Sequence, residues 1–365
     1  MSRVHLGDVA IEHKETCKED KSMYPIVGLE HLTPEQITLQ NWDLNTENTF
    51  TKVFRKGNIL FGRRRAYLKK AAVAPFDGIC SGDITVIEAK EDKIIPELLP
   101  FVIQNDDLFD FAVGKSAGSL SPRVKWTHLQ NYEFELPDKQ KQHELAKVLW
   151  AIEDTRKSYQ QLIKRTDELV KSQFIELFGT ETNHPEDVKY VRLGELASYI
   201  NGYAFKPDDW SLTGLPIVRI QNLTGTNEKF NYYDGEYPSQ VEINNGDVLI
   251  SWSASLGVYL WNGGKAILNQ HIFKVDFNKL PVNKAYFMVA VSQKLAEMVD
   301  KTHGATMKHI VKKDFDNTLV AYPKEEDQHR FAEFVEQSDK SKFELNRALD
   351  ELTATYKQII KDNLG

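Results

Sequence analysis

Two stretches of the chain combine a helical spacing of apolar residues with an absence of helix breakers. Neither the stretch from Pro137 to Phe178 nor that from Pro323 to Leu364 contains an internal proline or a glycine. Apolar side chains recur in them at intervals of three and four: Leu145, Val148, Leu149, Ile152, Tyr159, Leu162, Ile163, Leu169, Val170, Phe174, Leu177, and then Phe331, Phe334, Val335, Leu345, Leu349, Leu352, Tyr356, Ile359, Ile360. This pattern predicts two long helices with coiled-coil-like stripes. At 1.5 Å per residue each would form a rod of about 60 Å, so the two stripes should pack on each other.

The segments before these helices have a mixed pattern. Four short runs of β-branched or alternating apolar residues, bounded by Gly, Pro and Asn, predict strands: 57–61, 83–89, 246–252 and 271–277. Helical spacing returns in the segments that begin at about Pro96 and Asn283. Each long helix is therefore preceded by a globular part that contains both strands and helices.

The chain repeats once, at about half its length. The string VHLGDVA from Val4 returns as VRLGELA from Val191, and YPIVGLEHLT from Tyr24 returns as LPIVRIQNLT from Leu215. Further matches follow in the same order: Lys56–Phe61 with Asn245–Ile250, Gly118 with Gly304, Pro137 with Pro323, and Gln142-His143 with Gln328-His329. Such a repeat sets the architecture before any local motif does.

The repeat predicts an α+β fold of four parts. These are a mixed α/β domain (1–136), a long helix (137–179), a linker with a second mixed domain (180–322) and a second long helix (323–365). An approximate twofold axis would place the helices antiparallel, with the two domains held apart as separate recognition points.

Composition excludes several other classes. With 41% hydrophobic and 11% aromatic residues, the chain has the make-up of a globular protein and not of a disordered or fibrous one. Its longest apolar runs fall far short of the ~20 residues that span a bilayer, and its first residues lack a signal-peptide core, so we expect a cytoplasmic protein without a membrane partner. The two cysteines predict neither a disulfide framework nor a zinc site. The net charge of −7 argues against non-specific coating of nucleic acid.

Several strings imitate catalytic motifs and fail on context. Gly114–Gly118 fits GxSxG, but a helical segment precedes it where a nucleophile elbow needs a strand. A phosphate loop at the same place would need glycine where Phe109 stands. Asp83, Glu88 and Lys90 resemble the acidic residues and lysine of a metal-dependent nuclease, yet the second copy carries His271, Asp276 and Asn278 there. The ten histidines have no metal-ligand spacing, so we predict no catalytic residue and no metal ligand.

An arginine-rich segment after a predicted strand indicates contact with nucleic acid. Arg63, Arg64 and Arg65 are followed by Lys69 and Lys70. A loop can present such guanidinium groups to phosphates or to guanine edges. The second copy has Ser251–Gly257 (SWSASLG) at the same place, so one scaffold would present different side chains. The alternative is an ordinary solvated loop.

A second candidate segment is a glycine turn rich in hydroxyls and cations in both copies. It reads KSAGSLSPRVK from Lys115 to Lys125 and KTHGATMKHIVKK from Lys301 to Lys313. Capping of the preceding helix is the alternative explanation.

Taken in order, the motifs of the second half resemble a target recognition domain of the specificity subunit of a type I restriction-modification system. They are VRLGELASYINGYAFKPDDW, GLPIVRIQNLTG, NGDVLIS, ILNQHIFKV, HGATMKHI and AYPKEEDQHRF. The first half follows the pattern more loosely, with VHLGDVA, YPIVGLEHLT, KGNILFG, GSLSPRV and ELPDKQKQHEL. It has Cys80–Asp83 where the second half has Leu268–His271.

The resemblance implies a non-catalytic subunit that recognises double-stranded DNA. Each target recognition domain would read one half of a bipartite, asymmetric site. Family partners are two adenine methyltransferase subunits, which carry S-adenosylmethionine and would flip the target adenine out of the stack, and a restriction subunit that uses ATP and Mg. The chain itself would need no cofactor. The residues expected at DNA are Arg63, Arg64, Arg65, Lys69, Lys115, Ser119 and Arg123 in the first domain, and Ser251, Ser253, Asn269, Gln270, Thr306 and Lys308 in the second.

The helical lengths also predict the spacing of the site. A rod of about 60 Å, set against 3.4 Å per base pair, suits half-sites of roughly three to four base pairs with a spacer of about five to eight. From the residues alone one competing interpretation stays open, a pseudo-dimeric coiled-coil scaffold that joins two protein partners. A stand-alone nuclease or methyltransferase ranks below both, because the residues that such chemistry needs are missing.

Overall fold

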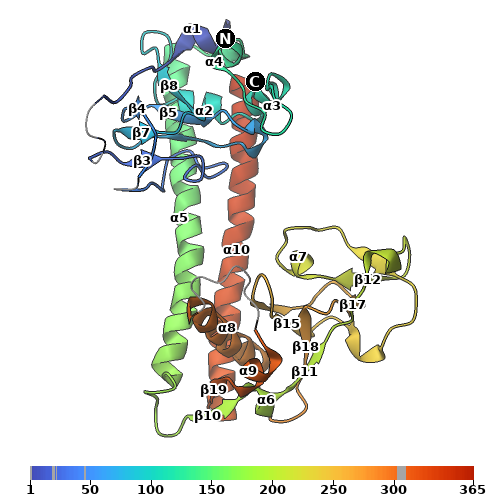
Figure 1. Cartoon of the computed structure of the whole chain (residues 1–365). Coiled ribbons are helices and arrows are strands. Elements are labelled where there is room, and N and C mark those ends of the chain that lie inside the picture. The colour runs from blue at the N-terminus through green and yellow to red at the C-terminus, as the bar shows by residue number, and fades with distance from the viewer. Residues whose placement is uncertain (1, 19–20, 22, 45–46, 302–309) are drawn as a thin grey trace. The chain divides into compact units, whose positions relative to one another are not determined.

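The computed structural model describes residues 2–18, 21, 23–44, 47–301 and 310–365. They form two compact units, one of Met1–Gln161 with Asn346–Gly365 and the other of Leu162–Leu345. Two helices of 40 residues each, α5 (Lys139–Phe178) and α10 (Glu325–Leu364), contribute a segment to both units (Figure 1). The prediction of two related mixed domains with two long helices is confirmed.

The first unit contains three small sheets. One sheet has the strand order β2-β8-β5-β6 and is antiparallel throughout, a second has the order β3-β7-β4, and β1 pairs with β9. The strands are β1 (Ser2–His5), β2 (Ala10–Glu12), β3 (Ile26–Val27), β4 (Lys52–Phe54), β5 (Ile59–Gly62), β6 (Ala71–Val73), β7 (Gly78–Cys80), β8 (Ile84–Ala89) and β9 (Glu133–Leu136). The short helices are α1 (Leu6–Val9), η1 (Ala66–Leu68), α2 (Leu99–Ile103), α3 (Asp106–Gly114) and α4 (Trp126–Leu129).

The second unit repeats this topology strand for strand. Its sheets have the orders β11-β18-β15-β16 and β13-β12-β17-β14, and β10 pairs with β19, so that only β13 is added at an edge. The strands are β10 (Lys189–Arg192), β11 (Ser198–Asn201), β12 (Leu215–Val218), β13 (Asn231–Tyr233), β14 (Glu242–Ile243), β15 (Val248–Ser251), β16 (Gly257–Leu260), β17 (Ala266–Leu268), β18 (Ile272–Asp276) and β19 (Leu319–Tyr322). The helices are α6 (Leu193–Leu196), η2 (Pro207–Asp209), α7 (Ile220–Leu223), η3 (Ser239–Val241), α8 (Lys284–Lys301) and α9 (Lys312–Asn317). The four strands expected from alternating patterns are β5, β8, β15 and β18.

The helical segment before each long helix differs between the copies. The second copy has one continuous helix, α8, whereas the first breaks between α2 and α3. The break lies at Asn105, which is extended and whose side chain accepts a hydrogen bond from the backbone N–H of Asp107 at 3.1 Å, as an N-cap does. The second copy has no such break, because α8 runs without interruption from Lys284 to Lys301.

In the first unit, the ends of both long helices complete the core of the globular part. Leu145 and Leu149 of α5 and Tyr356 and Ile360 of α10 are buried in one cluster with side chains of α2, α3 and the sheet. Burial of apolar surface here contributes roughly 25 cal/mol per Å². The globular part is therefore fixed to its helical segments by a shared core.

In the second unit, the long helices are antiparallel. Lys342 of α10 forms an ion pair with Asp167 of α5 at 2.8 Å, while Phe331 packs on Phe178 with ring centroids 5.5 Å apart. Residues later in α10 therefore contact residues earlier in α5, as antiparallel helices require. Tyr286 of α8 packs on the same aromatic rings, and this joins the helices to the mixed domain.

A buried glutamine fixes the start of each long helix in the same way. The Gln142 side chain accepts from the backbone N–H of Ile95 at 2.9 Å and donates to the carbonyl of Pro137 at 2.7 Å. Gln328 accepts from Asn283 at 3.0 Å and donates to Pro323 at 2.9 Å. These two glutamines are equivalent in the sequence repeat. In each unit the glutamine side chain pairs with one backbone N–H and one backbone carbonyl beneath the protein surface.

Replacing either glutamine by methionine should destabilise its own unit. Gln142→Met and Gln328→Met keep the side-chain length but leave a buried N–H and a buried carbonyl unpaired, which costs about 1–3 kcal/mol of unfolding free energy. Hydrogen exchange at increasing urea, followed separately in the two units, measures this. Gln140→Met is the matched control, because Gln140 is exposed and its side chain donates to Glu144 on its own helix at 3.2 Å. Equal effects of all three substitutions would contradict the assignment.

Candidate nucleic-acid interface

Three loops of the first unit meet where the sequence places its arginines. The three loops are joined by backbone hydrogen bonds. The N–H of Arg63 donates to the carbonyl of Asp83 at 3.0 Å, the N–H of Val124 to the carbonyl of Arg63 at 2.9 Å, and the N–H of Arg65 to the carbonyl of Pro122 at 2.8 Å. We call the segments Arg63–Arg65, Ser81–Asp83 and Lys115–Arg123 together the three-loop surface. Two candidate segments, far apart in the chain, therefore form one surface.

The centre of this surface is an ion cluster on Asp83. Arg123 donates to both carboxylate oxygens, from Nε at 2.7 Å and from Nη2 at 3.1 Å, while Arg64 Nη1 lies 3.5 Å from Oδ2. The hydrogen bond from Arg123 holds the pKa of Asp83 below its usual range. A pKa lowered by folding means that the pair stabilises the fold fully above the carboxyl's unfolded pKa, near 4, and that this is lost as the pH falls through the lower folded value. Asp83 is therefore ionised at neutral pH.

The predicted DNA-binding residues of the first unit differ in exposure. Arg65, Lys115, Ser119 and Arg123 are exposed, whereas Arg63 and Arg64 are partly buried. The exposed residues present cationic and hydroxyl groups at this surface.

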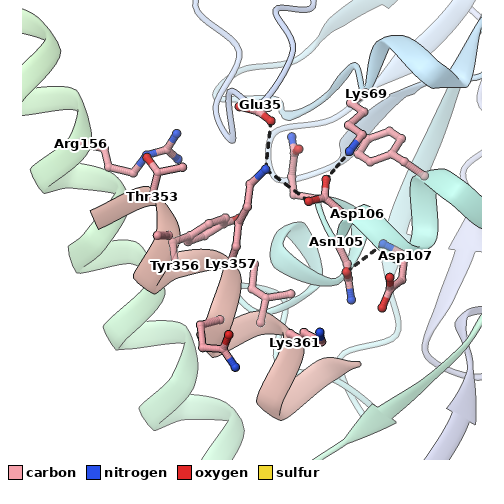
Figure 2. A pocket seen from close by; sticks show the side chains of 15 residues that line it. Glu35, Lys69, Asn105, Asp106, Asp107, Arg156, Thr353, Tyr356, Lys357 and Lys361 are labelled. Carbon is pink, nitrogen blue, oxygen red and sulfur yellow. Dashed lines mark hydrogen bonds and ion pairs between the residues drawn. The ribbon is translucent and has the colours of Figure 1, made fainter. Parts of the chain in front are cut away.

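Lys69 lies elsewhere, in a pocket of about 300 Å³ in the first unit. Its ammonium is 2.5 Å from Asp106, and Lys357 of α10 bridges Asp106 at 3.3 Å and Glu35 at 3.4 Å (Figure 2). Burial alone would raise the pKa of Asp106, but the two lysines hold it below its usual range. Lys69 thus belongs to a charged contact between α3 and the end of α10, not to the three-loop surface.

The second unit builds the same junction from different side chains. The backbone N–H of Trp252 donates to the backbone carbonyl of His271 at 3.4 Å, and the N–H of Ile310 donates to the carbonyl of Trp252 at 3.0 Å. These bonds match those of Arg63 with Asp83 and of Val124 with Arg63. The Trp252 and His271 rings lie 5.6 Å apart. An aromatic pair thus stands where the first unit has an arginine and an aspartate.

Both loops contain one residue in the left-handed backbone region at the same position. Arg65 has φ 55° and Ala254 has φ 57°. A residue with a Cβ is held there at a cost of about 1–2 kcal/mol. Strain repeated at equivalent positions indicates that the loop conformation itself is selected.

Two residues of the second unit that were expected at DNA are buried in the structure. Ser251 is fully buried, because its hydroxyl donates to the carbonyl of Ser255 at 2.5 Å inside the loop that follows β15. Asn269 is only 8% exposed, because it lies beside the end of β11, where Tyr203 forms a bridge with it. Both side chains are therefore buried, not exposed at the surface of the second unit. Ser253 and Gln270 are partly exposed, and Thr306 and Lys308 lie outside the described residues.

The sequence-based reasoning missed the two groups at the centre of the junctions. Asp83 was considered as part of a nuclease-like string and His271 as its mismatch, and both were noted at a place where the two halves differ, but neither was named as a residue of the site. Their alignment in the repeat, directly before β8 and β18, was the available signal.

Within the described part of the chain no group of three or more His, Cys, Asp or Glu side chains could hold a metal ion. No described helix is long and apolar enough to cross a membrane.

Comparison with known proteins supplies the class. The family model of the type I restriction modification DNA specificity domain matches residues 3–165 and again residues 185–353. The model matches twice in tandem, in agreement with the internal repeat. The chain belongs to the type I restriction-modification DNA specificity family.

Individual relatives are distant. The chain is 26% identical to the EcoBI specificity subunit of Escherichia coli over 145 residues, which are 39% of this chain and 30% of that protein. It is 26% identical to the MjaVIII specificity subunit of Methanocaldococcus jannaschii over 193 residues, covering 52% and 44%. The match therefore spans less than half of each of these two relatives. A putative MjaX specificity subunit of the same organism is 20% identical over 358 residues, covering 88% and 81%.

Solved structures share the fold. A chain from a study of complex assembly and conformational transition of the type I R-M system has a TM-score of 0.58 at 21% identity, covering 99% of this chain and 97% of that one. The S subunit of a type I system from M. genitalium has a TM-score of 0.54 at 13% identity, covering 100% and 96%.

Proposed function

We propose that the chain is the DNA-recognition subunit of a type I restriction-modification complex. Its two domains read the two halves of a bipartite, asymmetric site and so direct adenine methylation by partner subunits. The chain contributes no catalytic group. Work on chromosomal DNA would place the complex in the cytoplasm.

The observation that carries this proposal is the repeated junction. Both units use the same backbone bonds and the same strained loop position, but one presents arginines around Asp83 and the other presents Trp252 beside His271. A scaffold that only joined two identical partners would have no need to diversify one surface in this manner. Two domains that read different half-sites need such a difference, because base edges are distinguished by side-chain chemistry.

The partners would supply the chemistry. Two methyltransferase subunits would bind S-adenosylmethionine, and a restriction subunit would use ATP and Mg. A groove of about 850 Å³ in the second unit, among α5, α8 and α10, is a candidate docking site for a methyltransferase. Its walls include Val170, Met288, Val289, Val335 and Leu260, and Leu260 is 46% exposed. Val170 and Val335 are buried at the base of this groove, while the partly exposed Met288 and Val289 and the exposed Leu260 are available to a partner.

The test is single-molecule sequencing of N6-methyladenine in cells that express the methyltransferase with and without this chain. We expect a bipartite motif, with half-sites of roughly three to four base pairs and a spacer of about five to eight, that is absent without the chain. A control with the chain alone should give no methylation. Unchanged methylation by an active partner would refute the proposal and favour the scaffold.

A further inference from the structure

In the three-loop surface, Asp83 is more deeply buried than the two arginines with which it pairs. The side chains of Arg123 and Arg64 are 43% and 38% exposed, whereas that of Asp83 is 22% exposed. Arg123 reaches both carboxylate oxygens with Nε and Nη2, and Arg64 also donates from Nη2 to the hydroxyl of Ser121 at 2.9 Å. A bidentate bond to a carboxylate fixes the plane of a guanidinium as well as its position.

The geometry leaves the reading edge of Arg123 available. Its bonds to Asp83 use the Nε hydrogen and one hydrogen of Nη2. The opposite edge, formed by Nη1 and the other Nη2 hydrogen, can still donate two parallel hydrogen bonds. Guanine offers two acceptors, O6 and N7, at the matching spacing in the major groove. An arginine already held in plane loses less conformational entropy when it makes these bonds.

The cluster also remains cationic. One carboxylate faces the guanidinium groups of Arg64 and Arg123, and Arg63 follows the same strand. Among the described residues the buried Nε groups of Arg63 and Arg64 have no hydrogen-bond partner. Asp83 therefore orients the arginines without cancelling their attraction for DNA.

We propose that Asp83 is a positioning residue that holds Arg123 and Arg64 to read a G·C pair in the half-site of the first domain. This inference rests on the proposed function and adds to it the class of base and the residue that sets the geometry. The second unit has Trp252 and His271 at the same place, so its half-site does not depend on such a pair.

The decisive experiment compares Asp83→Asn with the unchanged chain in the complete complex with its methyltransferase. The methylated motif is determined by sequencing, and methylation rates are measured on oligonucleotides with each base substituted in turn. We expect discrimination at one G·C position of one half-site to fall about tenfold, while the other half-site keeps its specificity. Asp77→Asn is the matched control, because it removes an exposed Asp–Arg pair with Arg55 outside the three-loop surface.

A second variant keeps the test decisive if Asp83→Asn does not fold. Arg123→Lys retains the charge but not the bidentate geometry, and it should relax the same position while the salt dependence of binding stays unchanged. Equal loss at all positions, unchanged discrimination, or a first half-site without a G·C pair would overturn the inference. If the unchanged complex lacks any motif that depends on this chain, the proposed function fails instead.

Discussion

A complex with one extra heptad in both long helices is expected to methylate half-sites about three base pairs further apart. Both helices run from one unit into the other, so that seven added residues lengthen each connection by about 10.5 Å, or about three base pairs at 3.4 Å each. The insertions belong after Gln161 in α5 and after Leu345 in α10, where the units divide. Seven residues fall only ~20° short of two full turns, so each apolar stripe keeps its face.

The measurement is the methylated motif of the altered complex. Methylation at the original spacing should be lost because the two domains are then too far apart for it. Methylation at the longer spacing also requires the second domain to rotate about the DNA axis with the added base pairs. A heptad in only one helix is the control, since the helix–helix contacts of the first unit and those of the second, such as Lys342 with Asp167, could then not all stay in register, and stability should fall. A motif with its original spacer after both insertions would refute the role of the helices as a ruler.

The long helices and the repeat could be predicted because they depend on patterns that extend over many residues. Forty positions with apolar residues at helical spacing and without proline or glycine favour a helix. The ordered matches between the two halves predict that both halves have the same topology. The helix break at Asn105 could not be predicted in this way. It depends on one side chain that caps α3 in competition with a helical pattern that continues through it.

The sequence showed which candidate segments are equivalent in the two copies, but not how their side chains are oriented. The repeat brought Arg63–Arg65 and Ser251–Gly257 to equivalent places, and the structure joins the first of these to the segment that ends at Arg123. Sequence could not show that Ser251 points inward, because a serine at the end of a strand can equally face solvent or satisfy a loop carbonyl. The bond of its hydroxyl to Ser255 decides the matter. The pairing of Asp83 with Arg123 likewise joins residues 40 positions apart.

Replacing Phe331 by alanine is expected to destabilise the second unit by about 3–5 kcal/mol. Phe331 is 1% exposed and touches rings from two other helices: its centroid lies 5.5 Å from those of Phe174 and Phe178 of α5 and 6.2 Å from that of Tyr286 of α8. Tyr286 is fixed in turn by a hydrogen bond from its hydroxyl to the carbonyl of Ala321 at 2.7 Å. The cavity would therefore lie where the long helices meet the second domain.

This substitution should separate the two units in both stability and function. Hydrogen exchange should show lost protection in α8 and in the adjoining segments of α5 and α10, while the start of α5, whose Leu145 and Leu149 belong to the core of the first unit, keeps its protection. Recognition of the second half-site should fail at temperatures at which the first domain remains folded. Phe343→Ala on the same helix is the control, because Phe343 is 66% exposed and its loss should cost no more than about 0.5 kcal/mol. Equal loss of protection in both units would mean that the aromatic cluster stabilises the whole chain, and that the two readers fold as one cooperative body.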